Sequence, residues 1–278
     1  MSRIIFFTLL IIALVSCNTN NALGKRDMIY MKKRDFIVGD TALKVKPVFI
    51  SLPAGAVYPQ GWIKDWAEAA ANGITGHLDE WSATFGMAWK GVGFEATGAD
   101  PKTGMGWPLE QSSYWLDGGV RLAYIIGDSV LIRKITGRLD MVVNGVLNGG
   151  KSFIYWHDVD FKANDRTFEG WAHSHMGRAL VAYYEASGNP RVLQALEKVY
   201  SNFALVPVPF HTKEPVSGSN NVDPMLATYE LTGDKKILST VLNMSESAEQ
   251  TKPCKNGTMA NIKPDMALSR MKTFAFLQ

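Results

Sequence analysis

Three stretches of the chain share one pattern, in which apolar residues at helical spacing end at a glycine that is followed by Asp or Asn. The three glycines are Gly127, Gly188 and Gly233. Glycine at a helix C-terminus adopts the left-handed conformation without steric cost, and the following Asp or Asn suits a helix N-cap. Helical apolar spacing resumes after each turn. The pattern therefore predicts three helix–turn–helix hairpins.

The turn glycines lie 61 and then 45 residues apart, so each predicted unit is a long hairpin with room for loops. A single hairpin cannot bury its apolar face, so successive hairpins must stack in an open array or a closed ring. Strand patterns are scarce, since residues 47–53 and 205–210 alternate only weakly and prolines interrupt the second. The sequence thus predicts a mainly α protein.

The first residues are typical of a secretion signal. Arg3 precedes an apolar run from Ile4 to Val15, which is too short to span about 30 Å of hydrocarbon as a helix. The run ends in Leu14-Val15-Ser16-Cys17, which resembles the lipobox of bacterial lipoproteins. This resemblance implies removal of residues 1–16, lipidation of Cys17, and a place on the bacterial outer membrane or cell surface, or facing the periplasm. A plain signal peptide with a chance cysteine is the alternative.

Residues 17–45 are predicted to be a tether, residues 46–250 the helical body, and residues 251–278 a divergent tail. The tether contains five basic residues, namely Lys25, Arg26, Lys32, Lys33 and Arg34. They could contact anionic head groups, although a solvated linker is the simpler interpretation. A lipidated Cys17 would leave Cys254 alone, so neither an intramolecular disulfide nor a cluster of thiolate metal ligands is expected.

Composition narrows the class of function. The chain has 278 residues, 46% of them hydrophobic and 20% charged, as expected for a folded protein, and a formal net charge of +3. That charge is too small and too dispersed to indicate a nucleic-acid partner. Eight Trp and nine Tyr are present, and such rings line many clefts that hold sugars, although large cores use them too. Nucleotide-binding, serine-hydrolase and metalloprotease motifs are absent from the sequence, and neither a metal nor a cofactor is expected.

One group of candidate site residues lies on the predicted helix 166–187. His175 shares an apolar stripe of this helix with Trp171. His173 lies about 200° away around the helix, so the two histidines cannot chelate one metal ion. In a ring of hairpins this stripe would border the central cavity, whereas a hydrogen-bonded core histidine is the alternative.

A second group combines His77, Asp79 and Glu80. Two carboxylates beside an imidazole suit general acid–base chemistry on a sugar. Adjacent carboxylates also occur as helix caps and solvated turns, which is the alternative here.

Two further groups precede and follow the first predicted turn. Tyr114, Trp115 and Asp117 place stacking rings beside a carboxylate, although both rings suit a core equally well. His157 lies on a predicted loop, where binding residues concentrate.

Taken together and in this order, these segments resemble glycoside hydrolases of family 127 and their relatives, the β-L-arabinofuranosidase group. The resemblance runs from about Pro53 to about Leu242. Its segments are Pro59-Gln60-Gly61-Trp62, Gly76-His77-Leu78-Asp79, Tyr114-Trp115-Leu116-Asp117-Gly118 and residues 172–188. It implies an (α/α)6 toroid, an exo-acting enzyme on arabinose-containing or related plant glycans, and a pocket at one end of the ring. His175 takes the place of a family histidine that contacts the sugar.

The chain departs from the family in its nucleophile and its length. The family uses a zinc-bound cysteine nucleophile, and nothing in this sequence matches that cluster. Asp223 stands near the place of a second pocket histidine and is kept as a candidate carboxylate. Six such hairpins would need about 300 residues. We therefore expect a partial toroid, an incomplete ring truncated at its C-terminus.

Three functional hypotheses follow. The first is hydrolysis of a glycan by carboxylates, with Asp79, Glu80, Asp117 and Asp223 as catalytic candidates. The residues expected to bind the substrate are His77, Tyr114, Trp115, His157, Trp171 and His175. The second hypothesis is a non-catalytic glycan-binding lipoprotein. The third is a polysaccharide lyase, since lyases also use helical toroids with His, Tyr and Arg in the cleft.

Overall fold

The computed structural model describes residues 29–31, 50–82, 85–86, 108–153, 170–203 and 220–250. Its helices are α2 (Trp62–Asn72), α3 (Ile74–Trp81), α5 (Pro108–Ile126), α6 (Ser129–Leu147), α7 (Gly170–Ser187), α8 (Pro190–Tyr200), α11 (Val222–Thr232) and α12 (Lys235–Gln250). No strand occurs in the described ranges, which confirms the mainly α class. The predicted signal peptide, most of the tether and the tail 251–278 lie outside these ranges.

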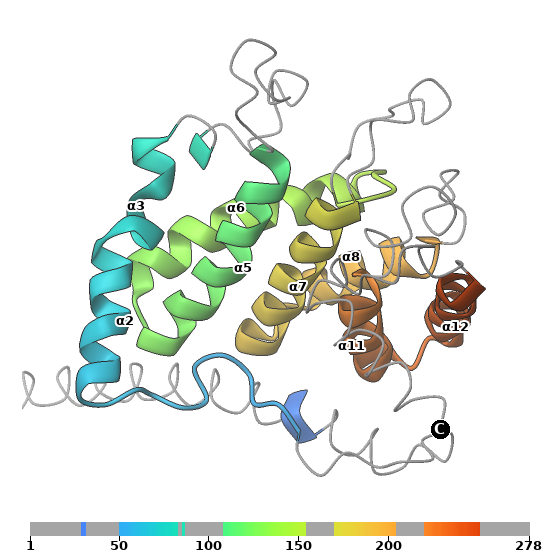
Figure 1. The fold of residues 1–278 in the computed structure, drawn as a ribbon, viewed down its shortest axis with the longest axis horizontal. Helices are drawn as coiled ribbons and strands as arrows, with labels where there is room; N and C mark the ends of the chain where they lie inside the picture. The colour runs from blue at the N-terminus through green and yellow to red at the C-terminus, as the bar shows by residue number, and fades with distance from the viewer. Residues whose placement is uncertain are drawn as a thin grey trace, which may run out of the picture.

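The helices pair as predicted into the hairpins α5–α6, α7–α8 and α11–α12, preceded by α2 and α3. The first helices of the three hairpins, α5, α7 and α11, lie side by side in one layer, and α6 and α8 pack against each other behind them. The described helices form a row from α2 at one edge to α12 at the other (Figure 1), and they do not close into a ring.

The three predicted turn glycines are confirmed. Gly127, Gly188 and Gly233 have φ values of 70°, 65° and 73°, in the left-handed region. In this region the β-carbon of any residue other than glycine lies too close to the neighbouring carbonyl oxygen, which costs about 1–2 kcal/mol. Each turn therefore ends one helix and reverses the chain at a fixed position.

The residue after each glycine begins the next helix. Asp128 accepts hydrogen bonds from the backbone N–H groups of Val130 and Leu131, at 2.8 and 3.1 Å. Asn189 and Asp234 accept one in the same way. Each side chain satisfies an N–H group that has no partner inside the helix, so the Gly–Asx pair defines both sides of the turn.

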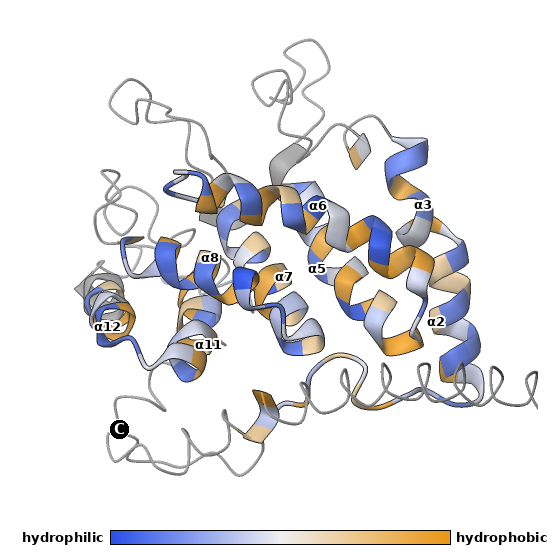
Figure 2. Ribbon diagram, turned by 180° about the vertical axis from the view of Figure 1, so that it is seen from behind, coloured by the Kyte–Doolittle hydropathy of each residue, from blue (hydrophilic) through white to orange (hydrophobic). Residues whose placement is uncertain are grey.

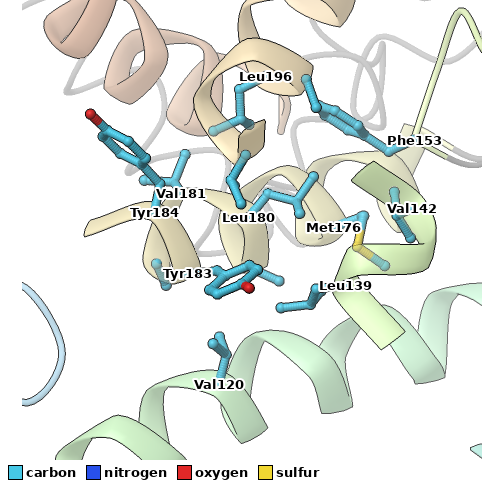
Figure 3. Packing of buried hydrophobic residues seen from close by; sticks show 14 of the residues in the cluster. Val120, Leu139, Val142, Phe153, Met176, Leu180, Val181, Tyr183, Tyr184 and Leu196 are labelled. Atoms are coloured by element: carbon cyan, nitrogen blue, oxygen red, sulfur yellow. The ribbon is translucent and has the colours of Figure 1, made fainter. Parts of the chain in front are cut away.

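Helix α7 lies at the centre of the molecule and packs against α5, α6, α8 and α11. Met176 and Leu180 are fully buried on it, and they meet core residues of the neighbouring helices such as Val120, Leu139 and Leu196 (Figure 3). The sequence predicted one inward stripe on this helix. The structure buries the opposite face as well, because α8 and α11 cover it.

The outer helices are amphipathic. Helix α8 buries Val192, Leu196 and Val199, whereas Arg191 and Glu197 are exposed. Both hydrophilic and hydrophobic residues are therefore visible around α6 and α8 in the view from behind (Figure 2). In the described part of the chain, none of the helices is both long and apolar enough to cross a membrane.

Candidate functional site

The face shared by α5, α7 and α11 brings two of the predicted carboxylates together around an arginine. Arg178 on α7 places Nε 3.1 Å from Oδ2 of Asp117 on α5 and 4.0 Å from Oδ2 of Asp223 on α11. Arg121, one turn after Asp117, donates from Nε to Asp117 Oδ1 at 2.9 Å. Asp117 is thus hydrogen-bonded by Arg121 at Oδ1 and ion-paired with Arg178 at Oδ2. We call Asp117, Arg178 and Asp223 the charged row.

The contacts with Arg178 set an upper limit on the distance between the two carboxylates of the charged row. Because one Nε atom contacts both, the two Oδ2 atoms are no farther apart than the sum of 3.1 and 4.0 Å. Carboxyl groups stand about 5–5.5 Å apart in retaining glycosidases and about 6.5–9.5 Å apart in inverting ones. The side chains of Asp117, Asp223 and Arg178 are 11%, 23% and 34% exposed, so solvent reaches the row.

One helical turn before the charged row, Tyr114 and His175 are in contact. Their ring centroids are 3.9 Å apart, and the planes are tilted by 43°. Tyr114 is 42% exposed, whereas His175 is only 5% exposed. An accessible phenol ring therefore lies over a buried imidazole, and substrate binding by Tyr114 and His175 stays a prediction.

His173 faces the opposite side of α7. Its Nδ1 atom lies 2.7 Å from Oδ1 of Asn221, and its ring packs against Phe153, Tyr200 and Phe203. Complete burial lowers the pKa of His173 to about 4, because an apolar environment disfavours the charged imidazole. The ring is therefore neutral at pH 7 and joins α7 to α8 and α11. The separation of His173 from His175 is as predicted.

Asp79 and Glu80 lie in a different part of the molecule, between α3 and α6. Lys134 donates to Asp79 Oδ1 at 3.2 Å, and Arg138 Nη2 donates to Asp79 Oδ2 at 3.1 Å. Lys134 also bonds Glu80 and the carbonyl oxygen of Gly76. These ion pairs fasten α3 to α6, a role that structural carboxylates commonly fill.

The environment of Glu80 does not suit a general acid at neutral pH. Hydrogen bonds from Lys134 and then from His77, whose Nδ1 lies 2.9 Å from Glu80 Oε2, lower the pKa of Glu80 from 4.5 to about 2. A carboxyl group with this pKa carries no proton at pH 7. His77 itself is bonded to Glu80 and stacks on Trp81 at 5.9 Å. Catalysis by Asp79 or Glu80 stays a prediction, as does substrate binding by His77.

The structure separates the neighbours Tyr114 and Trp115. Trp115 is buried, donates from Nε1 to the carbonyl oxygen of Thr75 at 2.7 Å, and lies under the guanidinium carbon of Arg138 at 5.4 Å. It therefore occupies the contact of α5 with α3 and α6, whereas Tyr114 faces α7. Three other predicted residues, Cys17, His157 and the side chain of Trp171, lie outside the described parts of the chain.

Arg178 was missed by the analysis of residue patterns, although a signal for it exists. Asp117, Arg178 and Asp223 each stand ten residues before the turn glycine of their own hairpin. Tyr114, His175 and Asn220 likewise stand thirteen residues before it. Aligning the three hairpins on their glycines would have placed Arg178 between the two aspartates. Equivalent positions of stacked repeats form rows, and the structure brings Asp117, Arg178 and Asp223 together in this way.

Asn220, the third residue at this offset, was also missed. It is 5% exposed, and neither its amide nitrogen nor its amide oxygen has a hydrogen-bond partner among the described residues. Buried polar atoms nearly always have a partner, and an unsatisfied one costs about 1–3 kcal/mol. An unpartnered amide of this kind is suited to bonding a polar ligand.

No three His, Cys, Asp or Glu side chains are gathered as metal ligands within the described ranges. Together with Arg121 and Tyr114, the charged row presents two carboxylates, two guanidinium groups and a phenol ring. Neither a family model, nor a curated protein, nor a solved structure matches the chain.

Proposed function

We propose that the face shared by α5, α7 and α11 binds a glycan and hydrolyses a glycosidic bond. The observation that carries the proposal is the charged row, in which Asp117 and Asp223 approach one guanidinium group from two different helices. Two carboxylates on one face of the molecule are the groups that glycosidase chemistry requires. The resemblance to family 127 supports arabinose-containing or related plant glycans as the substrate class and an (α/α)6 toroid as the complete fold.

Each group of the face has a role in this proposal. The exposed ring of Tyr114 stacks on the apolar face of a sugar, and the Asn220 amide bonds a hydroxyl group. Asp117 is the carboxylate whose position is fixed, because Arg121 donates a hydrogen bond to it and Arg178 forms an ion pair with it. Asp223 is the partner that exchanges the proton with the leaving oxygen or with water.

The test is release of reducing sugar from a panel of arabinose-containing plant glycans by the full chain. Asp117→Asn and Asp223→Asn should each lower kcat at least about 100-fold, because loss of a positioned acid or base costs about 10²–10⁴-fold. Glu68→Gln is the matched control, since Glu68 lies in an exposed pair with Lys64 on α2. Unchanged kcat in both aspartate variants would contradict the proposal.

A polysaccharide lyase is the second candidate, and the contact of Tyr114 with His175 beside Arg121 and Arg178 favours it. A lyase needs a base to remove a proton beside a uronate carboxylate, and arginines to stabilise the charge that develops there. Its product is unsaturated and absorbs ultraviolet light, whereas a hydrolase releases reducing sugar without that absorbance. Measuring both signals on the same digest separates the two reactions. Binding without either signal would indicate the non-catalytic alternative.

A further inference from the structure

Large apolar side chains are exposed on α2 and on the segment that precedes it. They are Leu52, Val57, Tyr58, Trp62, Ile63 and Trp66, which we call the α2 face. Trp62 and Trp66 are each 70% exposed, and their ring centroids lie 6.3 Å apart with planes inclined by 27°. Grouped exposed aromatic residues of this kind mark an interaction surface rather than ordinary solvent-facing positions.

Helix α2 is oriented against the usual rule for a helix on a globular protein. At about 100° per residue, Trp62, Ile63 and Trp66 fall within one arc of about 100°, and Ala71 lies on the opposite side. Ala71 is the residue that is buried. Full burial of a large apolar side chain stabilises a protein by about 1.5–3 kcal/mol. Because α2 buries an alanine and exposes two tryptophans, the fold lacks the stability that burial of the tryptophans would give. A partner surface that covered them would provide it.

The α2 face lies at the end of the molecule where the hairpin α5–α6 turns. A side chain added at Gly127 would lie 3.8 Å from the ring of Tyr58, and the segment before α2 runs along this end of the helices (Figure 1). Asp117 stands ten residues before Gly127 on α5, a rise of about 15 Å in a helix. The α2 face is thus separate from the charged row, which lies near the middle of α5.

We propose that the α2 face rests on a lipid membrane surface. Tryptophan, tyrosine and aliphatic residues together are typical of the membrane interface. Ile29 stands twelve residues after Cys17, the predicted site of lipidation. A chain of this length spans at most about 40 Å, so the point where the acyl chains attach would lie no farther than that from Ile29. The sequence also contains five basic residues between positions 25 and 34, and basic residues close to a membrane attract anionic head groups. This arrangement directs the charged row away from the bilayer, and it does not depend on the reaction catalysed there.

The experiment uses the full chain with vesicles of phosphatidylethanolamine and phosphatidylglycerol whose acyl chains carry bromine, a quencher of tryptophan fluorescence. The double variant Trp62→Phe/Trp66→Phe is compared with Trp81→Phe, whose indole is 62% exposed on α3. Quenching should fall at least about twofold in the double variant and stay at the level of the natural chain in Trp81→Phe. The same pattern in a Cys17→Ser background would show that the face contacts lipid without the acyl chains.

Equal quenching in the double variant and the natural chain would overturn the proposal, because the lipid-contacting indoles would then lie elsewhere. A glycan occupant is the competing outcome. It would appear as a change in the fluorescence of Trp62 and Trp66 with soluble arabinose-containing oligosaccharides and none with vesicles. Circular dichroism of the variants checks that the fold is kept, as expected for exchange of exposed aromatic residues.

Discussion

At the scale of single residues, burial decides what the two histidines of α7 can do. His175 touches an exposed tyrosine next to the charged row, whereas His173 is enclosed by three rings from two other segments and bonded to Asn221. The enclosed imidazole stays neutral because its pKa is about 4. It is therefore suited to joining helices and not to proton transfer at neutral pH.

This burial makes the stability of the protein depend on pH. The folded-state pKa of His173 is lowered from 6.5 to about 4, so the unfolded chain takes up a proton first as the pH falls. The stability that depends on a neutral His173 is fully present above pH 6.5 and is lost as the pH falls from about 6.5 to 4. It amounts to about 3 kcal/mol, since one pKa unit corresponds to about 1.4 kcal/mol. Urea unfolding across this range should show the loss, and His173→Gln should remove most of it. If the free energy of unfolding of His173→Gln fell with pH as steeply as that of the natural chain, His173 would not be the group responsible.

At the scale of helix pairs, a glycine sets the approach of α7 to α8 and α11. A β-carbon at Gly177 would lie 2.0 Å from the hydroxyl oxygen of Tyr200 and 3.1 Å from Pro224. Tyr200 is completely buried, and its hydroxyl has no hydrogen-bond partner among the described residues. Burial, with a smaller effect of Asp223, raises the pKa of Tyr200 well above its usual value. The hydroxyl is thus neutral and tightly enclosed.

A double-mutant cycle tests this contact. Gly177→Ala should lower the free energy of unfolding by about 1–3 kcal/mol, because it overpacks the junction. Tyr200→Phe should change it by less than about 1 kcal/mol, since the hydroxyl makes no bond that would be lost. The double variant should recover part of the free energy of unfolding that Gly177→Ala loses. Such non-additivity is expected for residues in contact. Additive effects would show that the hydroxyl does not limit the approach of the helices.

At the scale of the whole molecule, the edge of the row formed by α2 and α3 is held differently from its centre. The centre is one continuous apolar core around α7. Helix α3 instead depends on the ion pairs of Asp79 and Glu80 with Lys134 and Arg138, and on Trp115 beneath Arg138. An edge with few buried apolar residues opens more easily than a core.

Removal of Arg138 should therefore loosen this edge first. Arg138→Met leaves Asp79 with Lys134 alone, and we expect a loss of about 2 kcal/mol, below the 3–5 kcal/mol seen when a buried charge loses its sole partner. Amide hydrogen exchange should quicken in α3 before it does in α7. Lys64→Met is the matched control, because its pair with Glu68 is exposed and such pairs contribute less than about 1 kcal/mol. Unaltered exchange in α3 would contradict this account.

The sequence by itself determined the hairpins, because their signals are local. Glycine at a left-handed turn and Asp or Asn at the next N-cap act through bonds within a few residues, and all three turns stand where they were predicted. The sequence could also have grouped four of the candidate residues, because each lies on the first helix of a hairpin. They are Asp117, Asp223, Tyr114 and His175.

Only the tertiary structure decided which polar residues meet. Arg178 joins carboxylates 61 and 45 residues away along the chain, and Asp79 meets Arg138 rather than the charged row. Such pairings depend on how hairpins stack and rotate, which the periodicity within one helix does not specify. The same cause separated Tyr114 from Trp115, because residues adjacent in sequence point about 100° apart on a helix. Which of these faces is buried is set by the neighbouring helices and not by the residues themselves.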